Sequence, residues 1–236
     1  MRIDVATLFP EMCETVLSES IIGRARKSGK IELQCHQIRD YSTDKHRRVD
    51  DTPYGGGMGM VMQAEPIFRC FTAVTESFEE KPYVVYMSPK GTVFTQKKAV
   101  EFSQKRNIFV ICGHYEGVDK RVIDKIVDEE ISIGDYVLTG GELPALVMID
   151  AIARMCDGVL SSSECFEEES HYSGLLEYPH YTRPEVWEEM KVPDVLLTGH
   201  HKNIAGFRRN EALKITKARR PDMYILLDKT YNINNK

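Results

Sequence analysis

Apolar and polar positions change their spacing repeatedly along the first 160 residues, and each change marks an element. Short apolar or alternating runs are typical of strands, and apolar residues three or four positions apart are typical of helices. The pattern predicts strands over 2–9, 31–38, 83–87, 107–112 and 130–133, and helices over 11–26, 64–78, 95–105, 118–127 and 143–155. Strands that alternate with helices form a largely parallel sheet covered on both faces, so an α/β fold is predicted.

The polar segment 39–59 interrupts this order and closes on a glycine-rich run, 55–59. A long irregular stretch inside a compact domain is usually functional or mobile. The run lacks the lysine of a P-loop and does not directly join a strand to a helix, so neither the NTPase loop nor the dinucleotide fingerprint fits. Beside Arg47, Arg48 and Tyr54, it is either a loop that holds a phosphate or a nucleotide, or a flexible connector.

The pattern changes again after Gly158. Residues 158–178 are polar and acidic without periodicity, which is typical of a linker or a lid, and Glu164–Glu169 holds four glutamates. Such a group could bind a divalent cation or supply a base, although a solvated loop is the usual case. We place the domain boundary here, with a first domain over 1–160, a linker over 161–175 and a small basic helical domain over 176–236.

The predicted second domain has few candidate core positions. A basic helix is expected from His200 to Lys217, followed by a break at Pro221 and one last helical turn. The apolar residues that could form a small core before this helix are Trp187, Met190, Val192, Val195, Leu196 and Leu197.

Composition and charge refine this picture. The 236 residues are 42% hydrophobic, which supports a packed core, and the net charge of −5 argues against nucleic acid at first sight. Residues 199–221, however, carry seven cations and one anion, and a polyanion responds to such a local patch rather than to the net charge.

Neither a membrane nor an oxidising compartment is indicated. No apolar run is long enough to cross a bilayer, and the first ten residues predict a strand rather than a signal peptide. The six cysteines include no C-x-x-C pair and no zinc spacing, so we expect reduced thiols in a cytoplasmic protein.

Candidate chemistry lies in the turns that follow three predicted strands: 88–91, 113–117 and 132–142. Ligands of open α/β sheets bind at the carboxyl ends of the strands, and glycine there lets a ligand approach the backbone. Any one of these turns could be an ordinary connection. Three together, with a fourth glycine run upstream, predict one cofactor site built from three loops.

Six stretches together resemble the bacterial tRNA (guanine-N1)-methyltransferase family, TrmD. The resemblance covers essentially the whole chain and several of its motifs are long. The stretches are 1–9, Pro53-Tyr54-Gly55-Gly56-Gly57-Met58-Gly59-Met60, Ser88-Pro89-Lys90-Gly91, 112–117, 131–142 and Gly174-Leu175-Leu176-Glu177-Tyr178-Pro179-His180-Tyr181-Thr182-Arg183-Pro184.

The resemblance implies a SPOUT fold with a C-terminal trefoil knot in the α/β domain, which periodicity could not reveal. It implies S-adenosyl-L-methionine as cofactor, tRNA with guanosine at position 37 as substrate, and a homodimer whose active site forms between the subunits. It also implies that a carboxylate base removes the N1 proton while Arg154 stabilises the charge on O6. Glu116 would lie near the methionine end of the cofactor and meet a Mg²⁺ ion.

The remaining site residues follow from the same resemblance. Those expected to bind the cofactor are Tyr86, Met87, Ser88, Pro89, Gly113, Tyr115, Glu116, Gly117, Ser132, Ile133, Gly134, Tyr136, Leu138, Gly140 and Gly141. Those expected to bind tRNA are Gly55, Gly57, Gly59, His180, Arg183, Arg208, Arg209, Lys214 and Lys217.

One position departs from the family pattern. The family has an aspartate as its base five residues before Gly174, where this chain has Glu169. The extra methylene moves the carboxylate outward by about 1.5 Å, and a shift on the order of 1 Å can cost roughly 10²-fold in rate. Either the loop has adjusted, Glu168 or Glu167 serves instead, or the enzyme is weakened.

Other functions stay open on the residues alone. An RNA methyltransferase of the same fold could modify another base, and a protein with intact cofactor and RNA sites could bind tRNA with little chemistry. A nucleotide hydrolase fits least, because the glycine loop lacks its lysine.

Overall fold

The computed structural model describes residues 1–162 and 164–234, apart from the side chains of 164–165 and 228–234. The chain divides into two compact units, Met1–Ser161 and Ser162–Lys236. None of the described helices is both long enough and apolar enough to span a membrane. Free thiols are present at Cys13, Cys35, Cys70, Cys112 and Cys156, and the side chain of Cys165 lies outside the described residues.

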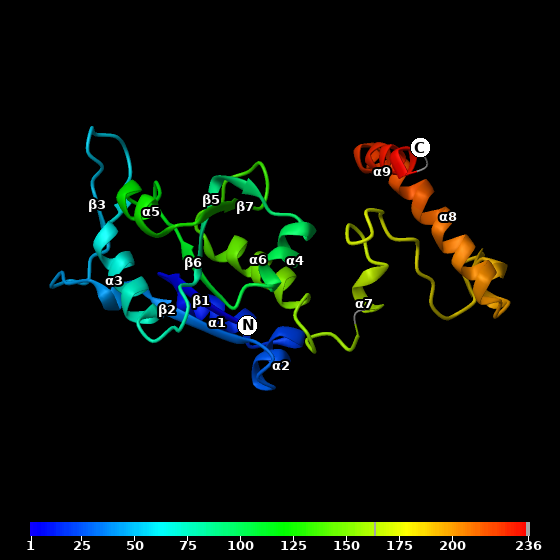
Figure 1. Ribbon diagram of the computed structural model, residues 1–236, viewed down its shortest axis with the longest axis horizontal. Helices are drawn as coiled ribbons and strands as arrows, with labels where there is room; N and C mark the ends of the chain where they lie inside the picture. The colour runs from blue at the N-terminus through cyan, green and yellow to red at the C-terminus, as the bar shows by residue number, and fades with distance from the viewer. Residues whose placement is uncertain (163, 235–236) are drawn as a thin grey trace. The chain divides into compact units, whose positions relative to one another are not determined.

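The first unit contains a five-stranded parallel sheet with the strand order β2-β1-β6-β5-β7 (Figure 1). The predicted α/β fold with a parallel sheet is therefore confirmed. Its strands are β1 (Arg2–Thr7), β2 (Glu32–Gln37), β5 (Tyr83–Val93), β6 (Asn107–Cys112) and β7 (Glu129–Ser132).

Helices cover both faces of this sheet. Because side chains alternate along a strand, Ile108 and Val110 of β6 pack into one core, and Phe109 and Ile111 pack into the other. The first core is covered by α1 (Pro10–Leu17), α2 (Ser20–Lys27), α4 (Gln96–Ser103) and α6 (Glu142–Ala153), and the second by a 3-10 turn (Ile38–Tyr41), α3 (Ala64–Thr75) and α5 (Lys120–Ile126).

The single helix predicted over 11–26 is wrong, because α1 and α2 are separate helices. Ser20 has a φ of 52°, which a continuing α-helix does not allow. Gly23 packs tightly against the chain between the helices, since a Cβ there would lie 2.0 Å from the carbonyl oxygen of Ser18.

The strand predicted over 83–87 is too short, because β5 continues to Val93. Its register shifts on the way, so that Met87 and Thr92 both align with Ile131 of β7. The residues between them, 88–91, form the excursion that the sequence indicated as a turn. The segment predicted as an unbroken loop contains the short strand β3 (Asp50–Asp51), which pairs with β4 (Val61–Met62) around the glycine run.

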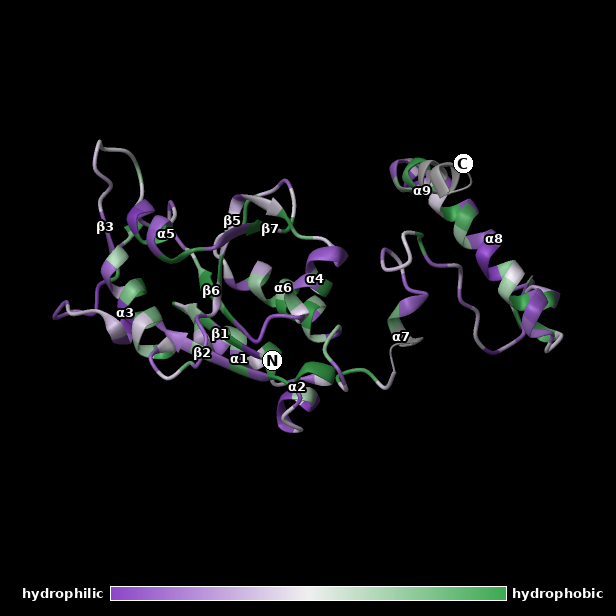
Figure 2. Ribbon diagram, viewed as in Figure 1, coloured by the Kyte–Doolittle hydropathy of each residue, from purple (hydrophilic) through white to green (hydrophobic). Residues whose placement is uncertain are grey.

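The second unit contains the predicted basic helix and more helix beyond it. It contains α7 (Glu164–Glu167), a hairpin of β8 (Val186–Trp187) and β9 (Met190–Lys191), a 3-10 turn (Asp194–Leu197), α8 (His201–Arg219) and α9 (Pro221–Asn234). The last of these is a full helix rather than a single turn. In Figure 2, α8 alternates between hydrophilic and hydrophobic bands, whereas β6 of the first unit is hydrophobic.

The small core predicted in this unit is also wrong. Trp187 is 60% exposed and Met190 is 59% exposed, so the hairpin presents its apolar side chains to the surface. The apolar residues of this region have no regular spacing, and nothing in their pattern brings them to one face. The buried residues on α8 are instead Ala212 and Thr216.

Candidate functional site

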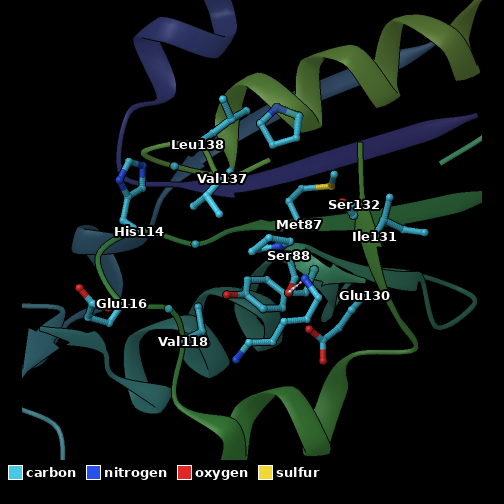
Figure 3. A pocket seen from close by; sticks show the side chains of 18 of the residues that line it. Met87, Ser88, His114, Glu116, Val118, Glu130, Ile131, Ser132, Val137 and Leu138 are labelled. Atoms are coloured by element: carbon cyan, nitrogen blue, oxygen red, sulfur yellow. Dashed lines mark hydrogen bonds between the residues drawn. The ribbon is translucent and has the colours of Figure 1, made fainter. Parts of the chain in front are cut away.

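A cavity of about 400 Å³ opens at the carboxyl ends of β6 and β7 and beside the excursion of β5 at 88–91 (Figure 3). The segments 88–91, 113–117 and 132–141, which we call the first, second and third loops, form much of its wall. Parallel strands end at the same edge of a sheet, so loops that are distant in sequence meet there. Figure 3 shows side chains from all three segments around the same space, among them Ser88, Glu116 and Leu138.

The structure brings together nearly all residues predicted to bind the cofactor. Only Gly134, which lies on the third loop, is absent from the wall of this cavity. The predicted residues that line it are Tyr86, Met87, Ser88, Pro89, Gly113, Tyr115, Glu116, Gly117, Ser132, Ile133, Tyr136, Leu138, Gly140 and Gly141.

A buried carboxylate fastens the second loop to β1 and α6. Glu142, the first residue of α6, is 3% exposed. Its Oε1 accepts a hydrogen bond from the hydroxyl of Thr7 at 2.5 Å, and its Oε2 lies 2.7 Å from Nε2 of His114. A carboxylate at a helix N-terminus is also stabilised by the helix dipole. The end of β1, the second loop and the start of α6 are thereby held together at one buried point behind the cavity wall.

The third loop approaches this pair so closely that only glycine fits. A Cβ on Gly140 would lie 2.2 Å from Cε1 of His114 and 2.6 Å from Oε2 of Glu142. The backbone N–H of Gly141 donates to the carbonyl of Gly113 at 2.9 Å. The second and third loops are therefore joined by backbone contact as well as by the His114–Glu142 pair.

The glycine run lies against the second loop. The backbone N–H of Glu116 donates to the carbonyl of Met60 at 3.0 Å, and a Cβ on Gly59, whose φ is +89°, would lie 2.6 Å from the Glu116 side chain. Farther along the run, Tyr54 is 99% exposed and Met58 is 93% exposed. Of the predicted tRNA-binding glycines, Gly59 is thus next to the cavity wall, whereas Gly55 and Gly57 have open space around them.

One cavity residue has a perturbed acidity. Burial and the nearby charge of Glu130 raise the pKa of Tyr86 above its usual value. Its phenol is therefore protonated at neutral pH and acts as a neutral wall and hydrogen-bond donor.

The two predicted catalytic residues belong to different units. Arg154 follows α6 directly in the first unit, is half-buried, and donates its backbone N–H to Asp150 at 3.2 Å. Glu169 follows α7 in the second unit and is also half-buried. Its neighbour Glu168 is exposed and accepts a hydrogen bond from the hydroxyl of Tyr178 at 3.1 Å.

The predicted tRNA-binding cations of the second unit are exposed. Arg208 on α8 lies over the ring of Tyr178, with 4.8 Å from its guanidinium carbon to the ring centre. The other exposed cationic or imidazole side chains of the prediction are Arg209, Lys214 and Lys217 on α8, and His180 and Arg183 in the segment before the hairpin.

Comparison with known proteins decides the family. Residues 1–225 match the family described as tRNA (Guanine-1)-methyltransferase TrmD. The chain belongs to the TrmD family. Curated relatives named tRNA (guanine-N(1)-)-methyltransferase agree over nearly their whole length. One from Ruminiclostridium cellulolyticum is 55% identical over 224 residues, covering 95% of this chain and 96% of the relative.

Two further relatives with the same name extend this similarity. The protein from Clostridioides difficile is 53% identical over 225 residues, covering 95% of this chain and 97% of its own. The protein from Chloroflexus aggregans is 55% identical over 223 residues, covering 94% and 87% respectively. The TrmD resemblance stated from the motifs is confirmed.

Several residues in the cavity of this TrmD-family chain were missed from the sequence. His114, Val137 and Thr139 lie inside the recognised loops, so their position was a sufficient signal. Lys120 and Ile123 come from α5, and only the packing of that helix beside the second loop reveals them. The remaining missed residues of the wall are Lys90, Val118, Glu130, Ile131 and Pro144.

A magnesium site at Glu116 has little support from the surrounding side chains. Within the described part of the chain, no group of three or more His, Cys, Asp and Glu residues is placed to hold a metal ion. Mg²⁺ is bound through oxygen ligands in octahedral geometry, and the described residues around Glu116 do not by themselves supply such a set. The ion at Glu116 stays a prediction, and no step of the reaction is assigned to it.

Proposed function

We propose that this TrmD-family chain transfers the methyl group of S-adenosyl-L-methionine to N1 of guanosine 37, the nucleotide 3′ of the anticodon in tRNA. The observation that carries the proposal is the convergence of the loops with the family motifs, 88–91, 113–117 and 132–141, on one cavity. We expect this reaction in the cytoplasm, as the tRNA substrate and the reduced thiols predicted from the sequence suggest.

The cavity suits a small organic cofactor. Its volume of about 400 Å³ falls within the range of roughly 300–1,000 Å³ that is usual for ligand pockets. Tyr86, Tyr136 and Leu138 offer apolar and aromatic wall, and the glycine loops allow a ligand to contact backbone groups. The carboxylates of Glu116 and Glu130 offer negative charge to a cationic ligand. S-adenosyl-L-methionine, when bound, supplies the methyl group on a positively charged sulfur.

The chain's own residues would activate the guanine. N1 carries a proton and is a poor nucleophile until that proton leaves, and Glu169 is the carboxylate proposed to remove it. Negative charge then grows on O6, where the guanidinium of Arg154 would stabilise it. The rest of the rate enhancement would come from holding the two reactants in line.

Position in the chain favours Glu169 over its neighbour as the base. Glu169 stands five residues before Gly174, where the family has its catalytic carboxylate, and it is half-buried, whereas Glu168 is exposed. We therefore assign the proton transfer to Glu169, with the loop adjusted to its extra methylene.

A knot in the first unit is part of the proposal. The third loop lies against the second through the pairing of His114 with Gly140, and α6 then begins beside Thr7 at the end of β1. A chain that leaves β7 at the sheet edge thus returns toward the middle of the sheet, in contact with the loop that follows β6. This path supports the SPOUT trefoil knot implied by the family.

We also propose that a second copy of the chain covers one apolar face of the first unit. Phe9, Met12 and Val16 along α1 are each more than 40% exposed, and so are Leu143 and Val147 on α6. The two helices pack side by side, so these residues form one surface. The surface continues to the third loop, where Val137 is 80% exposed and also lines the cavity. A homodimer would bring its partner to the rim of the site, and sedimentation measurements of the protomer number test this part.

Transfer of a labelled methyl group to unmodified tRNA transcripts tests the function. The transcripts carry guanosine or adenosine at position 37, and we expect only the guanosine form to be methylated. The family resemblance also implies a guanosine directly before position 37. Replacing that guanosine should abolish transfer as well, which separates this enzyme from an RNA methyltransferase with another target. Binding of tRNA without any product would contradict the proposal and favour a binding protein.

A further inference from the structure

The segment that carries Glu169 is attached to the RNA-binding helix through one stacked and hydrogen-bonded group. The guanidinium of Arg208 on α8 lies 4.8 Å from the centre of the Tyr178 ring. The hydroxyl of Tyr178 donates to Oε2 of Glu168 at 3.1 Å. A cation on α8 is thus connected, through two contacts, to the residue next to the proposed base.

Additional hydrogen bonds make this segment a compact loop. The backbone N–H of Glu177 donates to the hydroxyl of Ser170 at 2.9 Å. The backbone N–H of His171 donates to the carbonyl of Leu175 at 2.8 Å. Together with the Tyr178–Glu168 contact, these bonds join the outgoing segment of the loop, 168–171, to its returning segment, 175–178, both before and after Glu169.

The loop is also fixed to α8 at a second point. The backbone N–H of Leu176 donates to the hydroxyl of Thr216 at 2.8 Å, and that hydroxyl donates to the carbonyl of Ala212 at 2.7 Å. Thr216 is fully buried, so this attachment is shielded from water. The Thr216 contact anchors the returning segment of the loop at Leu176, and the Tyr178–Glu168 contact joins that segment to the residue directly before the base.

We propose that Glu168 and Tyr178 are positioning residues for methyl transfer, which couple the contact of Arg208 with tRNA to the placement of the Glu169 carboxylate. The inference rests on the proposed function. Neither residue touches the reacting atoms. They act by holding the segment that carries Glu169, 168–171, against α8.

The position of the Glu169 carboxylate decides how well it can act as a base. A catalytic base that is misplaced by on the order of 1 Å can lose roughly 10²-fold in rate, and Glu169 has a longer side chain than the aspartate of the family. A longer side chain has more rotamers to restrict, so the support of its backbone matters more. Burial and the hydrogen bond to Glu168 raise the pKa of Tyr178, which keeps its hydroxyl a donor at neutral pH.

The test compares single-turnover methyl transfer by wild type, Tyr178→Phe and Glu168→Ala, at saturating tRNA and S-adenosyl-L-methionine. Tyr178→Phe keeps the ring under Arg208 and removes only the hydroxyl. We expect each variant to lower the rate constant about five- to tenfold, the effect of one lost hydrogen bond, with unchanged dissociation constants for both ligands. The double variant should be no slower than either single variant, because both remove the same contact. Glu168→Gln, which keeps an acceptor oxygen, should recover most of the rate.

Tyr83→Phe is the matched control. The Tyr83 hydroxyl also donates to a glutamate at 3.1 Å, Oε2 of Glu129, but at the start of β5 rather than at the end with the cavity. Its rate constant should equal that of the wild type.

Amide hydrogen exchange over 168–178 gives a readout that does not depend on turnover. Exchange there should be faster in Tyr178→Phe than in the wild type or in Tyr83→Phe. Binding of tRNA should slow this exchange in the wild type and do so less in Arg208→Ala.

The outcomes separate the two claims. A wild type that binds tRNA and does not methylate it overturns the proposed function, and the positioning role with it. An active wild type with an equally active Tyr178→Phe overturns the positioning role alone. Additive losses in the double variant would also overturn it, since they would mean that the two residues act separately.

Discussion

Met1–Ser161 buries an apolar layer on each face of its sheet, whereas among the described side chains of Ser162–Lys236 only Ala212 and Thr216 are buried. The first unit has a close-packed core on each face of the sheet, with residues such as Phe102 and Phe109 fully buried. The second unit holds its functional loop with hydrogen bonds and one stacked cation.

This difference assigns separate tasks to the two units. A cavity enclosed by a packed core is already formed before a ligand arrives, and changes behind its wall alter folding stability together with cofactor binding. A loop fixed by a few polar contacts can be changed at one residue with little effect on the fold, so its variants report on chemistry. The predictions below test that separation.

The largest expected effect is the loss of chemistry in Glu169→Ala. Removing a general base lowers the rate by about 10²- to 10⁴-fold, and the affinity for S-adenosyl-L-methionine should be unchanged because Glu169 belongs to the other unit. Single-turnover methyl transfer and calorimetric titration of the cofactor measure the two quantities.

Glu169→Asp and Glu168→Ala complete this test. The aspartate variant should be active, since it restores the side chain typical of the family. A loss of activity in Glu168→Ala as large as that in Glu169→Ala would refute the assignment of the base.

The next largest effect is expected from Glu142→Ala in the first unit. The substitution leaves the Thr7 hydroxyl and the His114 ring without their buried partner and should cost about 3 kcal/mol of the free energy of unfolding. Because His114 and Gly140 line the cavity, cofactor binding should weaken at the same time. Urea denaturation and cofactor titration check both, with the exposed Glu101→Ala on α4 as the control. If Glu142→Ala lowers the free energy of unfolding but binds the cofactor with normal affinity, the proposed link between the core and the cavity is wrong.

Much of the first unit could be predicted from local pattern. The strands over 107–112 and 130–133 follow from short apolar runs, and the position of the loops follows from the rule for parallel sheets. The break between α1 and α2 could not, because it depends on how Gly23 packs against Ser18. The Glu142–His114 pair was missed because the two residues are distant in sequence and meet only after the chain returns from β7.

The second unit was harder to predict for a related reason. Its apolar residues, such as Trp187 and Met190, lack the regular spacing that signals a buried face, and they lie exposed. The motif around Glu169 was found by resemblance alone. Its attachment to α8 through Tyr178 and Thr216 needed the folded structure.

A smaller effect on stability is expected from Asp4→Asn, and it should depend on pH. Asp4 on β1 is fully buried, 2.7 Å from Nε2 of His36 on β2 and 2.8 Å from Nε of Arg2. Burial alone would raise the pKa of Asp4, but the hydrogen bonds from His36 and Arg2 outweigh it and lower the pKa below its usual value.

The sign of the pH effect follows from this shift. A lowered folded-state pKa stabilises the protein above the unfolded value of about 3.9, and the contribution is lost as the pH falls through the folded value. Asp4→Asn should therefore cost about 2 kcal/mol at neutral pH, and its difference from the wild type should shrink below about pH 4. Denaturation curves across this range measure it, with the exposed Asp124→Asn as the control. A difference that is constant with pH would show that the charge of Asp4 does not matter.

The smallest expected effects belong to single cations on α8. Each phosphate contact that is lost should flatten the salt dependence of tRNA binding by roughly one slope unit, and should weaken binding without affecting the cofactor. Arg209→Ala and Lys217→Ala test exposed positions of this kind. Lys98→Ala on α4 is the control, because that lysine is paired with Glu129 in the first unit at 2.7 Å. An unchanged slope in both α8 variants would mean that this helix is a solvated surface without phosphate contacts.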